Sequence, residues 1–201
     1  MDRGPLKSNG ASVSSRLISP AYVEQNRKMN RQEKFGGASV TYAPLVSSII
    51  DRMGVTHLLD YGCGAACNLA KHIKVSQGLT YQAYDPGVEK FASPPVPAQM
   101  VACIDVLEHV EPELVDNVLD DITRLTEGVA FLTICTKAAL KNLPDGRNAH
   151  LTQQPLKWWI PKICERFDVQ TVQQVSPESF FVVATSKFAL ESADGGMLSA
   201  N

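Results

Sequence analysis

The sequence has no long apolar run and no marked excess of charge of either sign. Its 19 basic and 21 acidic residues give a formal net charge of −2, which neither indicates nor excludes nucleic acid as a ligand. The longest apolar stretches, such as residues 129–135, are far shorter than the ~20 residues of a membrane-spanning helix. The first residues also lack the apolar centre of a signal peptide. We therefore expect a cytoplasmic protein with no membrane association.

Cysteine pairs with the C-x-x-C spacing of a zinc or redox site are also lacking. The five cysteines are odd in number and lie mostly among apolar residues, which is typical of reduced thiols in a protein core. They are Cys63, Cys67, Cys103, Cys135 and Cys164.

The length of 201 residues, 44% of them hydrophobic and 20% charged, suits one globular domain with a single core. Both ends are small and polar without periodicity, so we expect flexible tails at residues 1–19 and 189–201. The predicted domain is residues 20–188. The sequence does not indicate an oligomeric state.

Strand and helix patterns alternate along the domain. An amphipathic helix over residues 42–53 ends at Gly54, and Pro112 opens a second helix that reaches residue 125. A third, short helix over residues 154–166 contains Pro161. The predicted strands are residues 55–60, 79–85, 100–105, 129–136, 168–175 and 179–186. This order predicts an α/β fold with a doubly wound, mostly parallel sheet and an antiparallel last strand at its edge.

A glycine-containing turn follows the first predicted strand. After Asp60 the chain passes through Gly62 and Gly64 into a helix, and glycine lets a backbone approach a ligand closely. Asp85 ends the next strand 25 residues after Asp60, where a carboxylate can accept hydrogen bonds from both ribose hydroxyls. Asp60 beside the turn would repel a pyrophosphate, so a cationic sulfonium cofactor fits better. The alternatives are a purely structural turn or a nicotinamide dinucleotide site.

The stretches LLDYGCGAACNLA, YDP and CIDVLEHVEP together resemble class I S-adenosylmethionine-dependent methyltransferases, over residues 42–186. The resemblance implies a Rossmann-like fold in which Asp60, Gly62 and Gly64 lie against the methionine part of the cofactor and Asp85 against its ribose. It also implies that two further residues flank the methyl donor, Asp105 and Val106.

The sequence departs from this family between the second and third predicted strands. Only 14 residues separate Asp85 from Met100, so we expect the region around the family's strand three to be shortened. Adenine recognition is then hard to assign, and Phe91 is one candidate to pack on the ring.

A second group of polar residues follows the predicted strand 100–105. Asp105, Glu108 and His109 are spaced by three and four positions, so their side chains converge if the segment is helical. His150 lies in a later polar cluster with Asp145, Arg147 and Asn148. Carboxylates and imidazoles together suit a divalent ion such as Mg²⁺, Mn²⁺ or Zn²⁺.

The pattern Asp105, Glu108, His109 and a distant His150 resembles the Glu-x-x-Glu-His motif of metal-assisted O-methyltransferases, namely those of the ubiquinone pathway and those that methylate small-RNA 3′ ends. The resemblance implies that these four residues share an ion that binds two neighbouring substrate hydroxyls, with Asp105 in place of a longer Glu. In the metal-free alternative, Glu108 caps a loop, His109 packs on the cofactor, and His109 or His150 is a general base.

Two other features lead to smaller predictions. One of Trp158 and Trp159 should be core while the other walls a substrate pocket, and Asp145 and Arg147 form either part of a site or a surface ion pair. The segment from Tyr22 to residue 37 forms either a lid or a solvated basic helix.

The function that these patterns predict is methyl transfer from S-adenosylmethionine to a hydroxyl oxygen of a small metabolite, sugar or nucleotide. No Pro-Pro-aromatic or Pro-Cys motif of the DNA methyltransferases occurs after the fourth predicted strand. A non-catalytic S-adenosylmethionine-binding regulator or partner subunit and a nicotinamide-dependent oxidoreductase are the alternatives.

Overall fold

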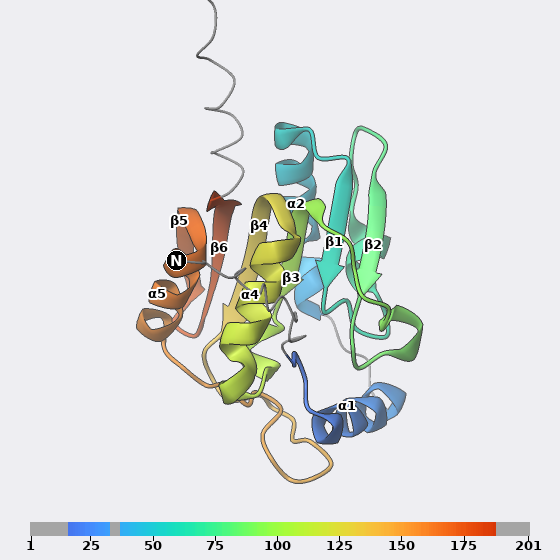
Figure 1. Cartoon of the computed structure of the whole chain (residues 1–201), viewed down its shortest axis with the longest axis vertical. Helices are drawn as coiled ribbons and strands as arrows, with labels where there is room; N and C mark the ends of the chain where they lie inside the picture. Colours follow the sequence, from blue (N-terminus) through green and yellow to red (C-terminus); the bar gives the residue numbers. More distant parts are fainter. Residues whose placement is uncertain (1–15, 33–36, 188–201) are drawn as a thin grey trace, which may run out of the picture.

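The computed structural model describes residues 16–32 and 37–187 (Figure 1). The strands are β1 (His57–Tyr61), β2 (Thr80–Tyr84), β3 (Ala98–Ile104), β4 (Thr126–Cys135), β5 (Phe167–Ser176) and β6 (Ser179–Ser186). The α-helices are α1 (Pro20–Gln32), α2 (Gly37–Met53), α3 (Asn68–His72), α4 (Val115–Leu125) and α5 (Leu156–Arg166). Short 3₁₀ helices lie at η1 (Glu89–Phe91), η2 (Leu107–His109) and η3 (Pro112–Leu114). From β1 onward, the predicted alternation of strand and helix is confirmed.

The six strands form one sheet in the order β2-β1-β3-β4-β6-β5. The first four are mutually parallel, and β6 runs antiparallel to both β4 and β5. The doubly wound, mostly parallel sheet with an antiparallel last strand is therefore confirmed. We expected the reversed strand at the edge of the sheet, and this was wrong: β6 lies between β4 and β5. It carries the buried Phe180, Val182 and Ala184, whereas β5 is largely exposed and forms the edge.

The sheet is short on the side of β2. Between β2 and β3 the chain forms only the single turn η1, and β2 is the edge strand. The predicted shortening around strand three is confirmed.

Both faces of the sheet are covered, which is why its central strands are apolar without alternation. On β1, Leu58 packs in the cluster formed with α2 and α3, while the next residue, Leu59, packs in the cluster formed with α4 and α5. Successive side chains of a strand point to opposite faces, so each central strand contributes to both clusters. At about 25 cal/mol per Å² of apolar surface, these two clusters supply the main driving force for folding.

The helix α1 lies beyond the carboxyl ends of the parallel strands (Figure 1). A small third cluster holds it there, in which Tyr22 packs with Leu143 and Ala149 from the connection between β4 and α5. Just before α1, the backbone N–H of Ser19 donates to the carboxylate of Glu111 over 2.8 Å. Leu17 packs against the cluster formed with α4 and α5, which is the main core. Residues 16–19 of the predicted tail thus contact the domain.

Residues 1–15 and 188–201, which make up most of the predicted tails, lie outside the described residues. Within the described part of the chain, no helix is long and apolar enough to cross a membrane.

Candidate active site

A cavity of about 320 Å³ lies at the carboxyl ends of the parallel strands. Open α/β sheets bind their ligands at this edge. Seven of the nine predicted site residues line the cavity: Gly62, Gly64, Asp85, Asp105, Val106, His109 and His150. The two that do not are Asp60 and Glu108. The cavity therefore joins the predicted cofactor turn to the predicted second site.

The turn after β1 has the backbone geometry that its glycines were expected to allow. Gly62 and Gly64 have φ angles of +82° and +64°, in the left-handed region that other residues avoid. The N–H groups of Gly62 and Cys63 both donate to the carbonyl of Tyr84, over 2.8 and 3.1 Å, which fixes the turn against the end of β2. A Cβ atom at Gly62 would lie 2.4 Å from Cγ2 of Val106, whereas one at Gly64 would have no neighbour within 4 Å.

Asp85 connects this turn to the end of β2. Its Oδ2 accepts the N–H of Gly64 over 3.0 Å, and its Oδ1 accepts the N–H of Gly87 over 2.8 Å. Burial raises the pKa of the carboxyl, and the two N–H groups oppose that rise. Each carboxylate oxygen keeps a further lone pair for a ligand hydroxyl. The structure thus holds Asp85 at the cavity, ready to accept hydrogen bonds.

Asp60 lies under the turn and does not face the cavity, although the resemblance implied contact with the cofactor. The alternation along β1 directs its side chain to the same face as Leu58, away from Leu59 and Tyr61. There its carboxylate accepts a hydrogen bond from the hydroxyl of Tyr81 and is only 2% exposed. Burial raises the pKa of Asp60 to about 7.

Asp105 and Val106 begin the segment after β3 and line the cavity beside the turn. Asp105 has a φ of +51° and is held by Thr133 of β4, whose hydroxyl donates to Oδ1 over 2.5 Å. Burial raises the pKa of this carboxyl as well, and the bond from Thr133 opposes the rise. Because Val106 contacts the Gly62 turn, the methyl-donor side of the predicted site is closely packed.

Two histidines of the cavity lining, His109 and His150, contact each other. Nδ1 of His109 lies 2.8 Å from the carbonyl of Ala149, and Nδ1 of His150 lies 2.6 Å from the carbonyl of Lys137. A carbonyl only accepts, so each Nδ1 donates to it, and in the neutral imidazole the lone pair is then on Nε2. The rings are nearly perpendicular, with centroids 4.7 Å apart. Burial lowers the pKa of His109 to about 4, with a further contribution from His150.

Glu108 is fully buried behind the cavity. Its Oε1 accepts the N–H of Cys135 over 2.9 Å, which ties η2 to the end of β4. Its Oε2 has no partner, and burial raises the pKa of the carboxyl well above its usual range. This arrangement matches the loop-capping alternative.

The four residues predicted to share a divalent ion do not form a compact ligand set. We searched the described residues for groups of at least three Asp, Glu, Cys or His side chains whose ligand atoms all lie within 4.8 Å of one another. The group found contains none of Asp105, Glu108, His109 and His150. The side chain of Glu108 is turned into the core, and the two histidines are oriented by different carbonyl groups.

The aromatic residues proposed as ligand contacts lie elsewhere. Trp159 is fully buried and donates from Nε1 to the carbonyl of Gln154, which confirms that one of the pair is core. Trp158 packs against the main core under the ammonium group of Lys162, so it does not wall the cavity. Phe91 lies in η1 and does not line the cavity either.

The polar residues near His150 organise their own loop. Asp145 and Arg147 form an ion pair over 2.7 Å with both side chains partly exposed, as in the surface-pair alternative. Asn148 accepts from the N–H of Ala139 and donates to its carbonyl, each over 2.9 Å. These contacts shape the connection that places His150 at the cavity.

Sequence reasoning missed much of the apolar wall. Met29 of α1, Leu143 and Ala149 line the cavity together with Tyr22, which we had named only as part of a lid. No local pattern marks the first three, because they meet only when α1 packs on the β4–α5 connection. Arg27 and Lys28 are exposed, as expected of a solvated helix face, and residues 33–36 lie outside the described residues.

Neither a protein-family model nor a curated protein matches this sequence. Solved structures do match. One is the 1,6-didemethyltoxoflavin-N1-methyltransferase of Burkholderia thailandensis with bound S-adenosylhomocysteine, at a TM-score of 0.59 and 14% identity, covering 85% of this chain and 92% of that one. The chain has a class I methyltransferase fold.

Two further structures share this methyltransferase fold. The magnesium protoporphyrin IX methyltransferase of Synechocystis PCC 6803 with bound S-adenosylhomocysteine matches at a TM-score of 0.54 and 14% identity, covering 84% of this chain and 95% of that one. The N-methyltransferase NodS of Bradyrhizobium japonicum WM9 matches at 0.53 and 11%, covering 81% and 99%. The named activities differ in their acceptors, so the methyltransferase fold alone does not identify the acceptor of this protein.

Proposed function

We propose that this protein transfers a methyl group from S-adenosylmethionine to a hydroxyl oxygen of a small metabolite, sugar or nucleotide. The observation that carries the proposal is the composition of one cavity. It places the Gly62–Gly64 turn and the carboxylate of Asp85 on one side, and two imidazoles with available Nε2 atoms on the other.

The lining of the cavity fits a sulfonium cofactor. Asp85 would hold the ribose hydroxyls, and Gly64, with open space at its Cα, would let the backbone approach the methionine part. The described lining contains the carboxylates of Asp85, Asp105 and Glu111 but no lysine or arginine, which disfavours a pyrophosphate. When bound, S-adenosylmethionine supplies an electrophilic methyl group and leaves as the neutral thioether.

His150 is the residue that we assign as general base. Its Nδ1 proton is held by the carbonyl of Lys137, which orients Nε2 and leaves it free to accept the proton of the acceptor hydroxyl. His109 contacts the ring of His150 edge to face and positions it. We assign His109 this lesser role because its low pKa makes it a weak base.

The remaining walls align the acceptor and exclude water. Tyr22, Met29 and Leu143 supply apolar surface from α1 and the β4–α5 connection. Direct displacement at a methyl group depends mainly on alignment of the acceptor oxygen, so a dry, rigid wall on this side favours it.

A divalent ion between Asp105, Glu108, His109 and His150 is the metal-assisted form of this proposal. The base form is better supported, because the four ligand groups are not gathered and Glu108 already bonds the backbone of Cys135. The two forms differ in one result: excess Mn²⁺ should restore activity to a ligand variant in the metal form only.

The first experiment is calorimetric titration with S-adenosylmethionine, S-adenosylhomocysteine and NAD⁺, followed by mass spectrometry of hydroxylated metabolites incubated with the protein and cofactor. We expect binding of the first two ligands and a methylated product. Tight binding of NAD⁺ alone would overturn the proposal. Binding of S-adenosylmethionine with no product from any hydroxyl acceptor would favour the regulator alternative.

A further inference from the structure

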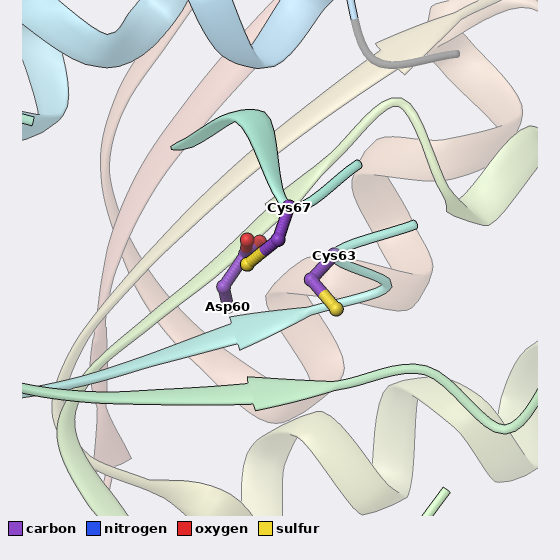
Figure 2. Close-up of side chains that lie close together, drawn as sticks. All are labelled: Asp60, Cys63 and Cys67. Carbon is purple, nitrogen blue, oxygen red and sulfur yellow. The ribbon is translucent and has the colours of Figure 1, made fainter. Parts of the chain in front are cut away.

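A cluster of two thiols and a carboxyl lies under the cofactor turn, apart from the histidines (Figure 2). It consists of Asp60 at the end of β1, Cys63 in the turn and Cys67 just before α3. The spacing of Cys63 and Cys67 is not that of a C-x-x-C pair, and no sequence pattern predicted that Asp60 lies beside them. Figure 2 shows the sulfur of Cys67 next to the carboxylate of Asp60, with Cys63 on the adjoining part of the same loop.

The distances within the cluster suit one small cation. One ligand atom from each of Asp60, Cys63 and Cys67 lies within 4.8 Å of the other two. Tetrahedral Zn²⁺ with bonds of about 2.0 to 2.3 Å separates its ligand atoms by roughly 3.3 to 3.8 Å. Rotation of the two cysteine side chains, whose neighbours in the loop are only glycine and alanine, can shorten the distances to these values.

The hydroxyl of Tyr81 is placed to orient two of the proposed metal ligands. Its hydroxyl donates to Oδ2 of Asp60 and lies 3.6 Å from Sγ of Cys67. A carboxylate that accepts a hydrogen bond on one oxygen is held in place to coordinate through the other, here Oδ1. Thus, β2 fixes the carboxyl from outside the loop.

The cluster is largely buried. The hydrogen bond that Asp60 accepts comes from a neutral group, the hydroxyl of Tyr81. Asp60 and Cys63 are 2% and 7% exposed. A cation bound between the three groups would take the place of their protons and balance the buried negative charge.

We propose that Asp60, Cys63 and Cys67 form a binding site for a zinc ion, with a water molecule as the fourth ligand. Two thiolates make the set soft, which favours Zn²⁺ over Mg²⁺ or Ca²⁺. The ion would fix the turn between β1 and α3. Because Cys63 also lines the cavity, a bound zinc ion would stabilise the cofactor side of the site without touching the acceptor side.

A disulfide between Cys63 and Cys67 is the competing use of the same two thiols. Oxidation to the disulfide removes two hydrogen atoms, so the mass of the protein distinguishes it from a bound zinc ion.

The test is a competition titration of the full-length protein, freed of metal, with Zn²⁺ and a chromogenic chelator. A parallel titration with Cd²⁺ follows the ultraviolet thiolate-to-metal charge-transfer band. Cys67→Ser is the informative variant, because Cys67 does not line the cavity, and Cys164→Ser is the matched control at an exposed cysteine. We expect one ion per chain and the cadmium band in the wild type and in Cys164→Ser.

In Cys67→Ser we expect zinc affinity to fall at least roughly tenfold and the cadmium band to weaken. Circular dichroism checks that the variant is folded, and Cys63→Ser replaces it if it is not. Three results would overturn the proposal: no zinc binding in the wild type, unchanged affinity in both cysteine variants, or a mass loss showing a Cys63–Cys67 disulfide in place of bound metal. A zinc ion lost in His150→Ala but kept in Cys67→Ser would also overturn it, by placing the ion at the histidines.

Discussion

The two sides of the cavity are built in different ways. The side that we propose for the cofactor, called the cofactor side, comes from one stretch of chain between Asp60 and Asp85, in which backbone groups and glycines set the geometry. The acceptor side combines α1, the segment after β3 and residues 143–150, which are far apart in the sequence. The first side is held by hydrogen bonds from backbone N–H groups, and the second by side-chain packing in a small cluster.

Because the two sides are built differently, substitutions on one side should affect a different step of the reaction from substitutions on the other. Changes in the turn should alter cofactor binding, because the turn has one permitted backbone path. Changes on the acceptor side should alter turnover or acceptor affinity and leave the cofactor bound. Four predictions test the separation.

The largest effect is expected for Gly62→Val. The turn would hold the valine at a φ near +82°, which its side chain disfavours, and that side chain would collide with Val106; the combined strain and overpacking amount to about 2 to 5 kcal/mol. We expect cofactor binding to be lost and the free energy of unfolding to fall, as measured by calorimetry and urea denaturation. From the sequence we expected glycine here for the close approach of a ligand, and the structure shows that Val106 also leaves no room for a side chain.

The double variant Gly62→Ala with Val106→Ala sharpens this test. Removing the Val106 side chain relieves the collision but not the φ strain, so binding should recover in part relative to Gly62→Ala alone. No recovery would show that the collision is unimportant.

His150→Ala should lower kcat by roughly 10²- to 10⁴-fold, the usual contribution of a general base, while the Kd for S-adenosylmethionine changes little. The control is His109→Ala, whose effect on kcat should be smaller. Restoration of His150→Ala by Mn²⁺ would instead identify the histidine as a metal ligand.

Asp85→Asn should weaken binding of S-adenosylmethionine by about 10- to 100-fold, because ribose hydroxyls bond an ionised carboxylate more strongly than an amide. Burial raises the pKa of Asp85, so wild-type affinity should fall as the pH drops into the acid range and the carboxylate gains a proton. In Asp85→Asn this part of the pH dependence should vanish. Calorimetry across the pH range measures both, and an identical profile in the variant would contradict the assignment.

The smallest effect is expected for Glu111→Gln. It replaces the charged acceptor of the Ser19 N–H by a neutral one at nearly the same shape, which costs about 1 kcal/mol of the contact that holds the start of α1. We expect a few-fold rise in KM for the acceptor and an unchanged Kd for the cofactor. If acceptor binding and cofactor binding weakened equally, the two sides of the cavity would not act separately.

A feature could be predicted from the sequence when the residues that determine it are close together in the chain. The strand after Gly54, the turn at Gly62 and Gly64, and the acidic end of β2 were predictable, because each depends on neighbouring residues. The inner place of β6 was not, since it depends on which strand of a hairpin buries more apolar surface against β4. Glu108 was misassigned as a cavity residue because a turn of 3₁₀ helix directs it into the core.

The class of fold and the glycine turn could be predicted from local patterns, because hydrophobic periodicity and glycine conformations act over a few residues. Three contacts required the folded chain: His150 meets His109, α1 forms a wall of the cavity, and Asp60 turns away from the cavity toward Cys67. Those contacts join segments separated by long stretches of chain or depend on which face of a strand a side chain takes, and no local pattern specifies them.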